Sequence, residues 1–244
     1  MILDISLPAT WTQLSQEQLR YAYFLLSSEQ YEPDQIKSLC ILRWGRLEPV
    51  GQFGRGYEVK HNGKSYNITP ENLAGLLPKM DWLLTVPDVP VRLDEIQGRE
   101  AKYRADLQGL PFEEYLVLEN NYQGFIHTKR EDLLGQMCII LYGELLRMSP
   151  AEAYSVFMWF AAVKRLFADR FTHFFVPAPV DGSQSERDTF TALRKSMNTQ
   201  IRALTKGDIT KEKEILAMDV WRALTELDAQ AEEYEELKKM NHGK

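Results

Sequence analysis

The sequence has little of the chemistry that cross-links small secreted proteins or holds metal ions. Two cysteines, Cys40 and Cys138, lie inside apolar helical patterns and outside any paired motif. We therefore expect two buried free thiols in a reducing compartment. The histidines share no ligand spacing and none stands near a cysteine pair, so the pattern predicts no metal site and no cofactor. These histidines are His61, His127, His173 and His242.

The motifs that mark common enzyme classes are also missing from the sequence. There is no G-x-S-x-G, no Walker loop, no H-E-x-x-H and no dinucleotide fingerprint. The glycines of GQFGRG (51–56) precede a predicted hairpin and not a helix N-terminus, which favours a flexible loop over a phosphate cradle. Glu113, Glu114 and Glu119 are interleaved with aromatic residues in one predicted helix, which favours a solvated helix face over a catalytic pair. We expect a protein that is not an enzyme.

Long hydrophobic runs are absent too. The longest run in the apolar middle of the chain, 154–163, is about half of the ~20 residues that a membrane span needs, and Lys164 and Arg165 end it. The opening MILDISLPATW has no basic region followed by an apolar core, so no signal peptide is expected. Together these features predict no membrane partner and a cytoplasmic location, in the host cell if a phage encodes the chain.

Acidic residues outnumber basic ones in the chain as a whole, although one stretch has a local excess of basic residues. The net charge is −6, from 29 basic and 35 acidic residues, which argues against a dedicated nucleic-acid coat. Residues 43–64 nevertheless carry five basic and two acidic side chains among several aromatic ones. Such a mixture is typical of a nucleic-acid platform, with Arg55, Lys60 and Lys64 as candidate contacts. It is equally typical of a small sheet with one face on the core and one face in water.

The most apolar stretch, 129–175, predicts two helices that meet at Met148 and Ser149 in an antiparallel hairpin or a tight corner. Ser149, Pro150 and Glu152 form a capping box with proline at the first helical position. The stripe of the first helix contains Leu134, Met137, Cys138, Leu141, Leu145 and Met148. The stripe of the second contains Val156, Phe160, Val163, Phe167, Phe171 and Phe174.

The remaining patterns predict further helices and one β element. Cap signals start helices at Ser15, Pro33, Thr69 and Leu110, and the turn Asn62-Gly63 predicts a hairpin over 57–69. The stretch 176–186 is rich in proline, glycine and serine and predicts a linker. A helical stripe follows with Phe190, Leu193, Met197, Ile201 and Leu204; Gly207 ends it.

We therefore expect a mainly α protein: a multi-helix bundle with one small β-hairpin element in the N-terminal part. The predicted division is an N-terminal α+β part (1–105), an apolar helical core (106–176), the linker (176–186) and a C-terminal helical segment (187–244). Thr210 caps a short helix in the last segment, and Asp219 caps the final one, whose flanks are acidic. That final helix either packs on its own domain or docks on a partner.

Residues 197–237 carry a resemblance to a known family. A helix is followed by a turn with Gly207, Asp208, Thr210 and Lys211, then by a short helix with Ile215-Leu216 and a last helix over 220–227. This order resembles the C-terminal segments of tail assembly chaperone-like proteins of tailed phages and prophages, over about a sixth of the chain. The opening LPATWTQLSQEQL (7–19) also resembles the start of an uncharacterised prophage family of similar length.

The resemblance implies a non-enzymatic assembly role. Proteins of that family coat the long helical tape-measure protein before the tail tube polymerises around it. On this basis the expected partner is a tape-measure or other tail protein, and the expected contact surface is Trp221, Leu224, Leu227 and Tyr234. A structural connector or tail-completion component of the particle is the alternative. A nucleic-acid-binding regulator that uses residues 43–66 is a second alternative.

Overall fold

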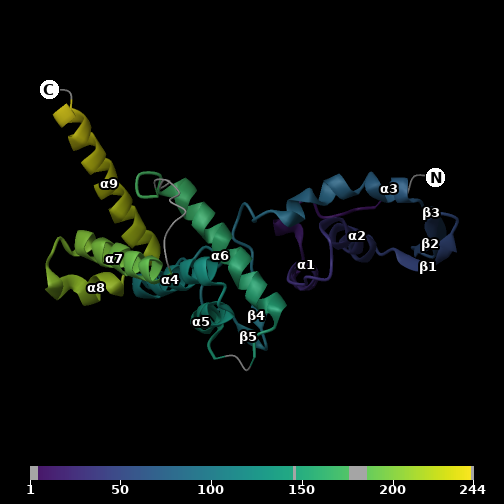
Figure 1. Cartoon of the computed structure of the whole chain (residues 1–244), viewed down its shortest axis with the longest axis horizontal. Helices are drawn as coiled ribbons and strands as arrows, with labels where there is room; N and C mark the ends of the chain where they lie inside the picture. The colour runs from purple at the N-terminus through teal and green to yellow at the C-terminus, as the bar shows by residue number, and fades with distance from the viewer. Residues whose placement is uncertain (1–4, 145–146, 176–185, 243–244) are drawn as a thin grey trace.

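The computed structural model describes residues 5–144, 147–175 and 186–242 of the chain. It confirms the predicted fold class, since the protein is mainly α-helical with a small antiparallel sheet in its N-terminal half. Figure 1 shows the long helix α6 (Pro150–Arg170) in the middle, with the first helices and the sheet on one side and α7 to α9 on the other. The buried apolar side chains form one connected cluster that includes residues from both sides.

The N-terminal helices are α1 (Gln16–Leu26) and α2 (Pro33–Trp44), preceded by the short 3-10 helix η1 (Trp11–Gln13). Ser15 caps α1 through a complete capping box, as the sequence predicts. Trp11 stacks on Tyr23 with ring centroids 5.7 Å apart, and its Nε1 donates to the Trp82 and Thr85 carbonyl oxygens at 3.1 Å each. Residues 77–85 are thereby fixed to the first helices.

The sheet has one strand more than the hairpin predicted over 57–69. Strands β2 (Gly56–His61) and β3 (Lys64–Ile68) form that hairpin, and both turn residues have positive φ. The expectation of a flexible loop at 51–56 is wrong, because β1 (Glu48–Phe53) pairs with β2 across a bulge between Pro49 and Gly51. Proline and glycine suppress the alternating signal of a strand, yet an edge strand with a bulge accepts both. Short helices α3 (Pro70–Ala74) and η2 (Leu77–Leu84) follow the sheet.

The central helices are α4 (Phe112–Thr128), α5 (Glu131–Tyr142) and α6, preceded by the two-residue strands β4 (Glu95–Ile96) and β5 (Arg99–Glu100). Ser149 and Glu152 form the predicted capping box of α6. Trp159 of α6 is completely buried, and its Nε1 donates to the Ala105 carbonyl oxygen at 2.8 Å. The helix α6 is therefore enclosed in its first half, as its sequence indicates.

Helices α5 and α6 both end earlier than the sequence predicts. Helix α5 ends at Tyr142, because Gly143 adopts φ +83°, where a glycine has no steric penalty, so Met148 lies outside the helix. The predicted stripe position Leu145 lies outside the described residues. Helix α6 ends at Arg170, so Phe171 and Phe174 pack on the core from the segment after it.

The C-terminal part contains α7 (Glu186–Thr205), the 3-10 helix η3 (Ile209–Lys211), α8 (Glu212–Leu216) and α9 (Val220–His242). Gly207 has φ +81° just after α7, as expected of a helix stop. The predicted linker 176–186 lies outside the described residues apart from Glu186, which opens α7. The side chain of Phe190 is also outside the described set.

Asp219 fixes the start of α9 to the start of α4. Its carboxylate accepts hydrogen bonds from the amides of Trp221 at 2.9 Å and Gly109 at 2.6 Å. The backbone around it pairs with the chain before α4, where the Val220 amide donates to the Leu110 carbonyl oxygen at 2.9 Å. From this anchor α9 runs past the other helices, and its C-terminal end projects beyond them (Figure 1).

Candidate functional site

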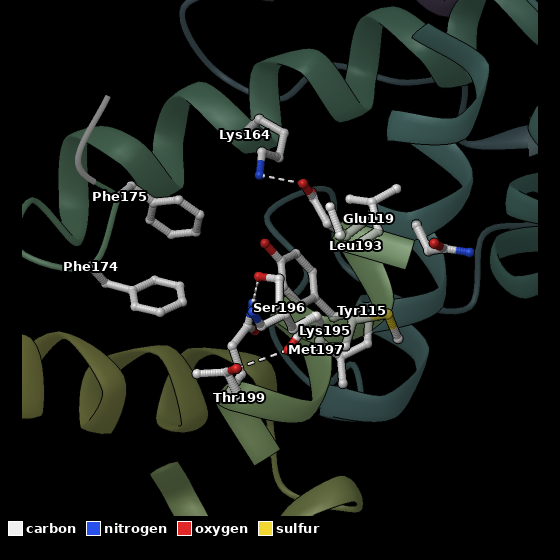
Figure 2. Close-up of a pocket in the computed structure, with 14 residues that line it drawn as sticks. Tyr115, Glu119, Lys164, Phe174, Phe175, Leu193, Lys195, Ser196, Met197 and Thr199 are labelled. Carbon is white, nitrogen blue, oxygen red and sulfur yellow. Dashed lines mark hydrogen bonds and ion pairs between the residues drawn. The ribbon is translucent and has the colours of Figure 1, made fainter. Parts of the chain in front are cut away.

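A hollow of about 600 Å³ lies between α4, α6, α7 and the segment that follows α6. Figure 2 shows side chains from these elements around it. The apolar part of its lining includes Leu116, Phe174, Phe175, Leu193 and Met197. We call this space the α4–α7 hollow.

The amphipathic pattern of α7 explains why one wall of the hollow is apolar. Leu193, Met197 and Ile201 follow the i, i+4 spacing of one helix face, and all three are only half-buried. Leu204, one turn further along α7, is buried. The apolar stripe of α7 is thus closed at its C-terminal end and open to the hollow in its middle.

The floor of the hollow holds an ion pair. Lys164 Nζ of α6 lies 2.7 Å from Glu119 Oε1 of α4, with side chains 23% and 17% exposed. Lys164 Nζ also lies 4.9 Å from the centroid of the Phe175 ring, a cation–π arrangement (Figure 2). The expectation that Glu119 belongs to a solvated face is therefore wrong, because tertiary packing turns it inward.

Two oxygen acceptors of residues that line the hollow have no hydrogen-bond partner among the described residues. They are Glu119 Oε2 and Gln200 Oε1, and both are shielded from water by the protein. A buried acceptor without a partner costs free energy, and because these two oxygens are shielded they do not open onto the hollow. The lining of the hollow favours an apolar or aromatic group.

The ionisable groups that line the hollow include an ion pair and a buried phenol. Its carboxylate is paired with a lysine, and burial raises the pKa of the Tyr115 phenol well above its usual value. Within the residues that the structure describes, no three His, Cys, Asp or Glu side chains are grouped to hold a metal ion.

The predicted contact surface on the last helix divides into a buried part and an exposed part. Leu224 and Leu227 are buried in the core, and Trp221 packs edge-on against Phe167 while its Nε1 donates to the Asp106 carbonyl oxygen at 2.8 Å. Tyr234 is 68% exposed. The stripe is continuous in sequence, so periodicity alone does not indicate where the chain's own core stops covering it.

Beyond that core, α9 continues as a segment that we call the α9 arm, residues 231–240. Leu237 and Met240 of the arm are 55% and 63% exposed. Sequence reasoning missed these two residues, although they extend the stripe that ends at Tyr234. The spacing of three residues from Tyr234 to Leu237 and from Leu237 to Met240 was the sequence signal that could have indicated them.

A joint that sequence reasoning missed holds α9 against the segment after α6. The backbone amides of His173 and Phe174 both donate to Asp228 Oδ1 at 2.9 Å. The His173 ring lies 3.4 Å from a Glu235 carboxylate oxygen and 3.7 Å from one of Glu232. These partners are more than fifty residues apart, so no local pattern could indicate the joint.

The three candidate nucleic-acid contacts are not brought into one patch. Arg55 lies at the turn before β2 and Lys64 at the turn after it, at opposite ends of that strand. Lys60 lies between them and faces Glu48 across the β1–β2 ladder. All three side chains are exposed, but the sheet separates them.

Comparisons with protein-family models, with curated proteins and with solved structures find no match for this chain. Within the described ranges, no helix is both long enough and apolar enough to cross a membrane.

Proposed function

We propose that this protein is a non-enzymatic binding protein for an amphipathic helix. More particularly, we propose that it is a phage or prophage tail assembly chaperone whose partner is the tape-measure protein. The α4–α7 hollow carries this proposal, because its half-covered apolar wall favours a helix face with a large apolar side chain.

Two further features support the proposal. The segment that resembles tail assembly chaperones, 197–237, supplies the second half of α7, which contributes to the lining of the hollow, and most of α9. The outer faces of α9 carry several exposed glutamates, which keep a complex with an apolar helical partner soluble.

Affinity capture from a producing cell tests the proposal. The full-length protein should retain a long helical tail protein, identified by mass spectrometry. The variants Leu193→Glu and Met197→Glu place a charge in the apolar wall and should reduce that capture at least about tenfold. Asn198→Glu is the matched control, since it adds the same charge to an exposed position of α7 outside the hollow.

The outcomes separate the candidate roles. Capture that returns no tape-measure-like protein, or capture that all three variants leave unchanged, would refute the proposal. Recovery of the protein from purified, mature particles would instead favour the structural connector or tail-completion role.

A further inference from the structure

A second, smaller hollow lies on α7 beside the α4–α7 hollow. It measures about 350 Å³, and the described side chains that line it all belong to α7. Lys195 and Thr199, which are labelled in Figure 2, line both hollows. The two spaces therefore meet along one side of α7, and a molecule that fills the α4–α7 hollow also lies next to the second one.

The lining of the second hollow is basic. Its charged side chains are Arg194, Lys195 and Arg202, all exposed, and its other described side chains are polar and uncharged. Arg194 and Arg202 are eight residues apart, so they lie on one face of α7 about 12 Å from each other along the helix. Among the residues that the structure describes, no carboxylate lies within ion-pair distance of these three cations.

The α4–α7 hollow has the same sign of charge. Three of its described lining side chains are charged, and two of them, Glu119 and Lys164, neutralise each other as an ion pair. Lys195 is left as the unpaired charge of this lining. At physiological salt, exposed charges act over about 8 Å. The local positive charge of α7, and not the net charge of −6 of the whole chain, therefore determines which flank a bound helix presents here.

Two kinds of partner offer negative charge to such a face, an acidic helix and a nucleic-acid strand. The described side chains that line the second hollow include no aromatic ring, so bases find no surface there on which to stack. A phosphate backbone also makes no use of the apolar wall formed by Leu193 and Met197. An amphipathic helix uses both spaces, with apolar side chains in the first and carboxylates over the second.

We propose that the helix bound by this protein carries acidic residues along the flank that faces Arg194 and Arg202. This inference rests on the proposed function, because it gives the charge pattern of the same partner. Glutamates spaced i, i+4 and i+8 have the same rise, about 6 Å per step, as positions 194, 198 and 202 of α7. Lysines at those positions are repelled, so the face also discriminates against basic helices.

Binding of synthetic helices tests the proposal directly. The probes are fluorescent peptides of about 18 residues, roughly five helical turns, that share one leucine-rich face. They differ only on one flank, which carries glutamate, glutamine or lysine at positions spaced i, i+4 and i+8. Fluorescence anisotropy with the full-length protein measures each Kd. The glutamate peptide should bind at least about tenfold more tightly than the lysine peptide, and high salt should narrow this gap.

Variants of α7 assign the preference to its basic face. Arg194→Glu with Arg202→Glu should make the lysine peptide the tighter ligand. Arg194→Gln with Arg202→Gln should bring the peptides within about threefold of one another. Lys79→Glu with Arg99→Glu is the matched control, because it makes the same change of charge at exposed positions that line neither hollow, and it should leave the order unchanged. Circular dichroism verifies that each variant keeps its helices.

A single added charge on this face should have a small effect. Asn198→Glu sets one negative charge among the three cations, so the lining stays positive. It should weaken binding of the glutamate peptide by no more than about threefold. It therefore remains a control for the larger losses expected of the charged variants in the apolar wall.

The proposal fails if the lysine peptide binds as tightly as the glutamate peptide, if neither binds, or if the arginine variants leave the order unchanged. It also fails if a single-stranded DNA oligonucleotide at equal concentration displaces the glutamate peptide, because the face would then belong to a nucleic acid.

Leu193→Ala separates this proposal from the proposed function. It removes part of the apolar wall and should weaken binding of all the peptides alike. If it leaves them bound as before while the arginine variants reverse the order, the hollow is not the binding surface, and the acidic preference of α7 stands. Capture of a tail protein that the arginine variants leave unchanged would refute the acidic flank and leave the proposed function intact.

Discussion

Helices α6 and α7 are similar in length and both carry an apolar stripe, yet the protein covers them differently. Phe160 and Trp159 of α6 are fully buried among aromatic rings. Leu193 and Met197 of α7 are half-buried and line a hollow. The contrast indicates that the stripe of α6 stabilises the fold, whereas the middle of the α7 stripe is left partly uncovered.

The difference arises from the neighbours of each helix. Helix α6 packs against α1 and α5, and aromatic side chains of α4 complete its surroundings. Helix α7 packs on α4, α8 and α9, but its middle faces the ion pair of Lys164 and Glu119 across open space. An apolar stripe is thus enclosed in the core or left partly open according to the elements packed on it.

The largest expected effect is at the centre of α6. Phe160→Ala removes a ring whose centroid lies 5.1 Å from that of Tyr122 and 5.7 Å from that of Trp159. The cavity should lower the free energy of unfolding by about 3–5 kcal/mol, measured by urea denaturation. Phe160→Leu, which keeps most of the volume, should cost clearly less; equal losses would contradict a tightly packed α6.

The second effect is an alkaline loss of stability that belongs to helices α2 and α5 and not to α7. Burial raises the pKa of the Cys138 thiol from 9.0 to about 12, and that of Cys40 equally. Because the folded pKa values are raised, their stabilisation is complete below pH 9 and is lost as the pH rises toward 12.

At about pH 10.5, the loss should be roughly 2 kcal/mol for each thiol. Urea denaturation at several pH values, with Cys138→Ala as the comparison, measures it. The variant should show a shallower decline with pH than the wild type. An identical decline would show that Cys138 does not contribute.

The sequence could predict those parts of the fold that local chemistry determines. The capping boxes at Ser15 and Ser149 and the Asn62-Gly63 turn are each set by residues within four positions of one another. Strand β1 was missed because Pro49 and Gly51 give no strand signal of their own, and only pairing with β2 makes that segment extended.

The candidate site was harder to predict, because its parts are distant in sequence. Glu119 and Lys164 are polar in any local pattern, and only the packing of α4 on α6 brings them together. Likewise Leu224 and Tyr234 belong to one stripe, yet one is buried and the other exposed, since only the tertiary structure determines where the core ends.

The joint between α6 and α9 gives an intermediate effect. Asp228→Ala removes the acceptor of the His173 and Phe174 amides and should cost about 1–3 kcal/mol. Hydrogen exchange should show faster exchange at those two amides. Asp228→Asn retains an oxygen acceptor and should recover much of the loss. No change at either amide would show that the joint does not hold in solution.

The smallest effect on stability should come from α7, and it sharpens the comparison within one helix. Leu193→Ala and Leu204→Ala make the same change at a half-buried and at a buried position. Leu193 buries less apolar surface in the folded state than Leu204 does. Its truncation should therefore lower the free energy of unfolding by under about 1 kcal/mol, against about 2–3 kcal/mol for Leu204.

Capture of a partner should rank these two variants in the opposite order. Leu193→Ala removes part of the hollow's apolar wall and should weaken capture, whereas Leu204→Ala, below its melting temperature, should leave capture unchanged. Urea denaturation and affinity capture on the same protein samples measure both quantities. If Leu193→Ala were as destabilising as Leu204→Ala, the middle of α7 would belong to the core, as α6 does. The proposal that the hollow is a binding surface would then be refuted.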